Sequence, residues 1–258
     1  MTTPTAVVQA LDVPAIGHEE AMDLARVEDE RLLALLRTLT PDDWTRPTDC
    51  TRWRVRELVQ HLIGSAAAQA SPVELVRQVL LARRLRAQVA ATHWVDTLNE
   101  AQIRRTAAVG VDDAAERWRS TSAAALRARR RLPAPVRALR VVDLGEAMGT
   151  RIGRQRLDYL FDTGFTRDTW MHRVDLARAV DRPLVVTAEH DGRIVAGIVA
   201  EWARLHDEPF TLHLGGPAGG RYTARGGGEP VEVDAVEFCR ILSGRAAGHG
   251  VLRHALPL

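Results

Sequence analysis

Three ionisable side chains lie on one predicted helix at positions where a helix that only packs would carry apolar residues. Asp168, His172 and Asp175 share a stripe with Phe161, Phe165 and Leu176, because at about 100° per residue these positions fall within an arc of about 100°. Burying ionisable groups without partners is costly. A divalent metal satisfies two carboxylates and an imidazole, so a metal site inside a helical bundle is the leading hypothesis.

His61 is the predicted ligand from a second helix, where it lies beside apolar residues. Asp168 and His172 are four residues apart, which sets their Cβ atoms about 5 to 6 Å from each other and lets both reach one ion. Helical bundles recurrently build metal centres from inward-facing carboxylate and histidine side chains. Alternatives stay open: the i,i+4 pair alone fits a surface ion pair, and His61 alone fits a core imidazole that donates to a backbone carbonyl.

The ligand types favour a catalytic zinc site. Two histidine nitrogens and one carboxylate oxygen suit zinc, and nickel, iron and manganese accept the same ligands. Three protein ligands leave a coordination position for water or substrate, which is typical of a catalytic centre. Asp175, one turn beyond His172, is then expected to orient an imidazole or to accept a proton. As a purely structural residue, it would instead pair with a nearby arginine.

The spacing of apolar residues predicts the helices that position these side chains. A helix N-cap is predicted at Asp112 or Asp113, and Asp181-Arg182-Pro183 is expected to end the helix that carries Asp168. The pattern between residues 136 and 153 is ambiguous between a turn and a short helix. The predicted helices cover residues 18–39, 54–68, 73–90, 94–105, 112–131 and 155–180.

Beyond Pro183 the pattern changes to that of a small α+β unit. We predict a strand at 184–187, a helix at 189–205, strands at FTLHLG, RYTARG and PVEVD, and a helix at 234–242. The glycine-rich run GGPAGGRYTARGGGEP lies between strands, so it predicts hairpin turns and not a phosphate-binding loop. The boundary is placed near 182: residues 1–182 form a metal-binding helical bundle and residues 183–258 a small α+β domain.

Composition argues against several functional classes. The net charge is +2 with acidic and basic residues interleaved, so nucleic-acid binding through the basic run RARRR at 127–131 is ranked last. The 35 basic residues are all arginine, which indicates a G+C-rich genome such as that of an actinobacterium. No membrane span or signal peptide is predicted. Cys50 and Cys239 do not form a disulfide framework. We predict that both are packing residues, with Cys50 a minor reactive candidate, and we expect a reducing, cytoplasmic setting.

Three separated segments resemble the mycothiol-dependent maleylpyruvate isomerase family: LLALLRTLTPDDWTRPTDCTRWRVRELVQHL, RDTWMHRVDLARA and DAVEFCRILSGRAAGHGVL. The resemblance spans most of the chain. It implies a DinB-like four-helix bundle followed by a small α+β domain similar to sterol carrier proteins. It also implies metal ligation by His61, Asp168 and His172, a catalytic carboxylate at Asp175, and a substrate-binding arginine at Arg245. In one departure, the family usually has glutamate where this chain has Asp168.

The implied cofactors are a divalent metal, zinc above all, and mycothiol or a similar thiol. The implied chemistry is thiolate addition to the cis double bond of a substrate such as maleylpyruvate, rotation, and elimination to the trans isomer. The same centre could transfer the thiol to another small electrophile. A non-catalytic DinB-like stress or small-ligand-binding protein is the alternative. Expected partners are a small-molecule substrate and the thiol, without nucleic acid or membrane, and the chain is expected to be a monomer or homodimer.

Overall fold

The computed structural model describes residues 6–89, 93–143, 153–256 and 258. The chain divides into two compact units. One unit is Gly17–Leu184, and the other combines Met1–Ile16 with Val185–Leu258. The segment between 136 and 153, ambiguous in sequence, includes residues 144–152, which lie outside the described residues.

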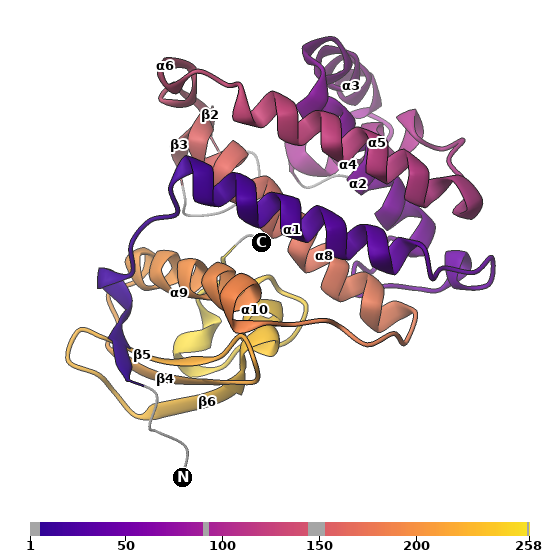
Figure 1. Cartoon of the computed structure of the whole chain (residues 1–258). Helices are drawn as coiled ribbons and strands as arrows, with labels where there is room; N and C mark the ends of the chain where they lie inside the picture. Colours follow the sequence, from indigo (N-terminus) through magenta and orange to yellow (C-terminus); the bar gives the residue numbers. More distant parts are fainter. Residues whose placement is uncertain (1–5, 90–92, 144–152, 257) are drawn as a thin grey trace. The chain divides into compact units, whose positions relative to one another are not determined.

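A bundle of four long helices forms the first unit (Figure 1). Their apolar stripes meet in one core that includes Leu32, Leu58, Trp118 and Leu176. A buried ion pair between Glu28 and Arg173, with Nε 2.6 Å from Oε1, joins the first helix to the last. The bundle helices are α1 (His18–Leu36), α2 (Val55–Ala70), α5 (Val111–Arg130) and α8 (Phe165–Ala179).

Two further helices, α3 (Pro72–Leu85) and α4 (Trp94–Arg105), pack against each other through Ala82, Leu85 and Ala101. Ser71 caps α3, because its side chain accepts a hydrogen bond from the backbone of Glu74. The short elements of this unit are η2 (Asp43–Thr45) and α6 (Ala134–Arg137).

Two predicted helix starts differ from the structure. The helix predicted from about residue 155 begins at Leu157, because Arg154–Arg156 forms strand β3, which pairs antiparallel with β2 (Arg140–Asp143). A π-helical turn, η3 (Tyr159–Gly164), then leads directly into α8. The N-cap of α5 is Gly110 and not an aspartate. Asp112 and Asp113 lie in its first turn, where they complement the helix dipole.

The second unit contains a four-stranded mixed sheet in the order β1-β5-β4-β6. Strand β4 pairs antiparallel with β5 and parallel with β6, and β1 pairs parallel with β5. Alternate residues of β4 are buried, as expected for a sheet with one covered face. The strands are β1 (Val7–Gln9), β4 (Phe210–Gly215), β5 (Gly220–Ala224) and β6 (Pro230–Asp234).

Helices α9 (Arg193–Leu205) and α10 (Ala235–Leu242) pack on this sheet (Figure 1). Trp202 of α9 lies at the centre of this core, with ring centroids 4.9 Å from Phe210 and 5.4 Å from Phe238. The short turns are η1 (Ala10–Asp12), η4 (Ala188–Gly192) and η5 (Gly250–Arg253).

The strand predicted at 184–187 is wrong. These residues form neither helix nor strand, and Val185 is 60% exposed. The N-terminal strand β1 provides the fourth strand instead. Apolar character alone did not decide between the two segments, because a strand also needs a neighbour with open backbone hydrogen-bonding groups.

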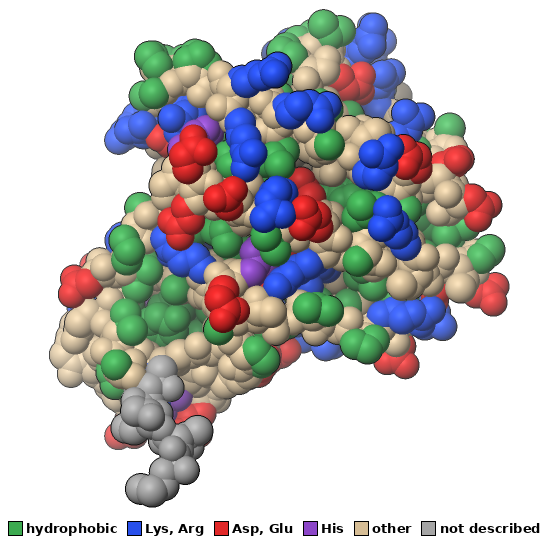
Figure 2. Space-filling model, viewed as in Figure 1, with side chains coloured by type: hydrophobic (Ala, Val, Ile, Leu, Met, Phe, Trp, Pro, Cys, Tyr) green, Lys and Arg blue, Asp and Glu red, His purple; other side chains and the backbone are tan. Residues whose placement is uncertain are grey.

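The fold class predicted from sequence is confirmed: the chain is mainly helical, with a small mixed sheet. None of the described helices combines the length and the apolar composition that a membrane crossing needs. Figure 2 shows acidic and basic side chains interspersed over the visible face. Within the basic run at 127–131, Arg129 is buried and Arg130 pairs with Asp23, so this run does not form a continuous basic patch.

Candidate metal centre

Helix α8 presents the three ionisable residues that the sequence singled out. His172 is 6% exposed and Asp175 0% exposed, whereas the side chain of Asp168 is 33% exposed. The helix starts directly from the π-helical turn at Tyr159–Gly164, and such turns are frequent at functional sites because they shift the faces of the following helix. Because Asp168 is the most exposed of these three side chains, the group opens to solvent on the side of Asp168.

His61 comes from α2, which packs in the same bundle. Its helix begins at Val55, and the Glu57 side chain accepts a hydrogen bond from the backbone of Arg54 at 2.9 Å, which stabilises the first turn. The apolar neighbours Leu58 and Leu62 hold this face of α2 in the core. His61 itself is 4% exposed.

The structure brings His61, Asp168 and His172 together. His61 Nε2 lies 3.5 Å from Asp168 Oδ2, and His172 Nε2 lies 3.5 Å from Asp168 Oδ1. One potential ligand atom from each residue lies within 4.8 Å of the others. The two imidazole rings meet edge to face, with centroids 5.1 Å apart. These distances suit three side chains that share one ion, whose bonds to nitrogen and oxygen are about 2 Å long.

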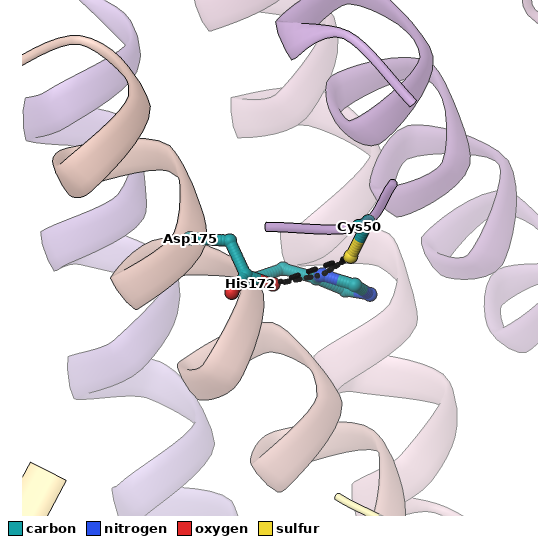
Figure 3. Close-up of side chains that lie close together, drawn as sticks. All are labelled: Cys50, His172 and Asp175. Carbon is teal, nitrogen blue, oxygen red and sulfur yellow. Dashed lines mark hydrogen bonds and ion pairs between the residues drawn. The ribbon is translucent and has the colours of Figure 1, made fainter. Parts of the chain in front are cut away.

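Asp175 lies on the opposite side of the His172 ring. Its Oδ2 is 3.0 Å from His172 Nδ1 and 3.5 Å from the Sγ of Cys50, which in turn lies 3.9 Å from His172 Nδ1 (Figure 3). A carboxylate that accepts the Nδ1–H bond holds the imidazole in the tautomer whose Nε2 lone pair faces Asp168. The sequence made Cys50 only a minor candidate, because two cysteines far apart in the chain indicate neither a disulfide framework nor a cysteine-rich metal site.

Trp53 is a site residue that sequence reasoning missed. Its ring centroid lies 4.9 Å from that of His61 and 5.7 Å from that of His172. The indole therefore covers one side of both imidazoles and removes that side from water. A signal was present, since Trp53 lies two residues before the start of the helix that carries His61, but only the packed structure places it against both histidines.

Comparison with protein-family models identifies the family of this chain. Residues 25–177 match the model described as the mycothiol maleylpyruvate isomerase N-terminal domain. The chain belongs to this family. The matched residues include the whole of α2, and Asp168, His172 and Asp175 of α8, so the family model covers the side chains that converge in the structure.

Solved structures of a mycothiol-dependent maleylpyruvate isomerase share the fold of this family member. Both the protein and a histidine-to-alanine variant of it align with a TM-score of 0.57, over 93% of each chain, at 18% sequence identity. At that identity the likeness establishes the fold. A comparison with curated proteins finds no match.

The donor atoms fit a metal ion. Neither ring nitrogen of the buried His61 makes a hydrogen bond within the described part of the chain, although buried polar atoms are nearly always hydrogen-bonded. A divalent ion between His61, Asp168 and His172 would satisfy Nε2 of His61, the nitrogen 3.5 Å from Asp168, and two nitrogens with one carboxylate oxygen form a common zinc donor set.

Without an ion, the pKa values of Asp168 and His172 follow from charge pairing. Burial alone would raise the pKa of Asp168, but its charge interactions with His172 and His61 outweigh burial and hold that pKa well below its ordinary value. Burial alone would lower the pKa of His172, but Asp168, Asp175 and Cys50 raise it well above its ordinary value. A proton on Nε2 of His172 therefore occupies the position at which a cation would bind, and a metal ion must displace this proton.

Arg245 belongs to the second unit. It follows Gly244, whose φ of 77° ends α10 in the left-handed region, and its backbone N–H donates to the Arg240 carbonyl at 2.8 Å. Its assignment to a substrate carboxylate stays a prediction. Cys239 is fully buried on α10, as expected for a packing residue.

Proposed function

We propose that this protein is a metal-dependent enzyme that uses a low-molecular-weight thiol such as mycothiol. It either isomerises a cis double bond, as in maleylpyruvate, or transfers the thiol to a small electrophile. Membership of the family supports the use of mycothiol. The observation that carries the proposal is the convergence of ligand atoms of His61, Asp168 and His172 within 4.8 Å, with the side chain of Asp168 partly exposed to solvent.

The role of each residue follows from its position in the site. A divalent ion held by His61, Asp168 and His172, zinc above all, would lower the pKa of a ligated thiol and so supply a thiolate at neutral pH. Asp175 is fully buried behind His172, so it orients that imidazole and balances its charge. Trp53 excludes water from one side of both histidines.

The isomerisation follows from the nucleophile. The thiolate sulfur adds to one carbon of the activated cis double bond, and the electron pair moves to the neighbouring carbonyl as an enolate. The former double bond is now single and rotates. Collapse of the enolate expels the thiolate and leaves the trans alkene, so the thiol is regenerated. Arg245 is proposed to hold a substrate carboxylate through a bidentate pair.

In the transfer alternative, the same thiolate displaces a leaving group from a small electrophile, and the thioether is the product. The thiol is then consumed in each turnover. The two reactions differ in stoichiometry, which separates them experimentally.

Metal content tests the site directly. Purified wild type is compared by elemental analysis with His61→Ala, Asp168→Ala and His172→Ala, and with His249→Ala, an exposed histidine, as the matched control. We expect about one divalent ion per chain in wild type and His249→Ala, and a large loss in the other three. Equal metal content in all five proteins would refute the site, provided that circular dichroism shows each to be folded.

Turnover tests the chemistry. The metal-loaded protein is incubated with mycothiol and maleylpyruvate, or with mycothiol and an aryl halide. Isomerisation without loss of thiol supports the isomerase, and thioether formation supports the transferase. Full metal occupancy without turnover of either substrate would favour the non-catalytic DinB-like alternative.

A further inference from the structure

His172 presents its two ring nitrogens to two different groups of ligand atoms. Nε2 faces Asp168 and His61, the proposed catalytic metal site. Nδ1 faces Asp175 of the same helix and Cys50 of the loop that precedes α2, and Figure 3 shows these two side chains converging on that nitrogen. The atoms of Cys50, His172 and Asp175 also lie within 4.8 Å of one another.

The spacing of this second group matches the face of a tetrahedral ion. The three distances are 3.0 Å from Nδ1 to Asp175 Oδ2, 3.5 Å from Sγ to Oδ2, and 3.9 Å from Sγ to Nδ1. Bonds of about 2.3 Å to sulfur and about 2.0 Å to nitrogen or oxygen place such ligands about 3.3 to 3.6 Å apart. Small side-chain shifts therefore suffice to bind one ion.

We propose that Cys50, His172 and Asp175 form a second metal site, selective for thiophilic ions such as Zn²⁺, Cd²⁺ or Cu⁺. The thiolate sulfur makes the donor set softer than that of the first site. A thiolate and a carboxylate together carry two negative charges, which neutralise a divalent ion. Cys50 is partly exposed, whereas Cys239 is buried, so an ion has access to this sulfur from solvent.

The shared imidazole makes the two sites antagonistic. A neutral imidazole offers one nitrogen lone pair, and its other nitrogen carries the proton. An ion on Nδ1 leaves Nε2 protonated and deprives the first site of a ligand, whereas an ion on Nε2 keeps Nδ1–H bonded to Asp175. A thiophilic ion at the second site therefore displaces the ion of the first. The assignment rests on these three side chains and does not require the thiol chemistry proposed above.

Cobalt spectroscopy tests the second site, because sulfur bound to Co²⁺ gives a near-ultraviolet charge-transfer band that nitrogen and oxygen ligands do not give. The test protein is His61→Ala, which lacks a ligand of the first site and keeps all three of the second. We expect Co²⁺ to produce the band in His61→Ala and in His61→Ala with Cys239→Ser. The band should be absent from His61→Ala with Cys50→Ser.

The outcomes separate the two metal proposals. No band in His61→Ala, or a band that survives Cys50→Ser, overturns the second site and leaves the first untouched. Asp168→Ala serves in the same role should His61→Ala not fold. In wild type loaded with Co²⁺, added Cd²⁺ should release the cobalt, and this release should be lost in Cys50→Ser. Equal release from both proteins would overturn the antagonism.

Discussion

His172 Nδ1 lies 3.0 Å from Asp175 Oδ2, and the same ring turns Nε2 toward Asp168 at 3.5 Å. The fully buried carboxylate thus selects the tautomer that a metal needs. An imidazole without such a partner would rotate and exchange its proton between nitrogens. The pairing of Asp175 with His172 explains why Asp175, like Asp168 and His172, lies on the inner face of α8.

Replacement of Asp175 by asparagine should weaken metal binding at the first site by about 10- to 100-fold, the usual effect of losing such a carboxylate partner. The side chain keeps its size but loses the charge that stabilises the Nδ1–H tautomer. Competition titration with a chelator measures the affinity. Asp49→Asn, whose partly exposed side chain pairs with Arg178, is the control, and equal affinities in both variants would contradict the role of Asp175.

Asp168→Glu should retain the metal. The side chain is 33% exposed, so there is space for the extra methylene, and the carboxylate can still reach the ion. Asp168→Ala removes a ligand and should lower metal affinity by more than about 100-fold, beyond the effect of losing an outer partner. Isothermal titration of the metal-free proteins compares the two. Loss of binding in the glutamate variant would show that the shorter side chain is required.

Breaking the buried pair between Glu28 and Arg173 should destabilise the helical unit strongly. Both side chains are at most 3% exposed, and removing one partner leaves the other charge buried, at a typical cost of about 3 to 5 kcal/mol. Urea unfolding of Arg173→Met measures the change. The exposed pair of Arg26 and Glu30 provides the control, since Arg26→Ala should cost about 1 kcal/mol or less. Similar losses in both variants would count against the argument.

Stability should fall as the pH drops from about 6.5 to about 4, partly because of His206. Burial, with the charges of His254 and Arg225, lowers the pKa of His206 from 6.5 to about 4. In this range the unfolded chain binds a proton at His206 that the folded chain excludes, so acid favours unfolding. The contribution is at most about 1.4 kcal/mol per pH unit. Urea midpoints between pH 7.5 and 4.5 should change less in His206→Gln; an identical pH profile would remove His206 as a cause.

Gly64→Ala should destabilise the contact between α2 and α4. A Cβ at this position would lie 2.7 Å from the Cβ and 3.0 Å from the Cα of Gln102, so the backbones must separate, and overpacking of this kind costs about 1 to 3 kcal/mol. Thermal unfolding measures the loss. Gly17→Ala, where a Cβ would meet nothing within 4 Å, should lose much less, and a tolerated Gly64→Ala would indicate that α4 moves easily.

Helix positions in the bundle could be predicted from sequence because each helix must bury an apolar stripe, and that stripe is visible in the spacing of residues such as Leu58 and Leu62. Strand assignments were less secure. Residues 184–187 are apolar enough for a strand, but Val7–Gln9 pairs with β5 instead. Pairing partners far apart in the chain leave no local signal.

The spacing of Asp168, His172 and Asp175 determined that these side chains share one face of a helix, and the family motifs determined the fold class and family. Only the tertiary structure decided that His61 meets two of them, that Trp53 covers both imidazoles, and that Cys50 approaches the far nitrogen of His172. Helical periodicity specifies which residues face inward. The packing of four helices and one loop, set by their side chains together, specifies which of those residues touch.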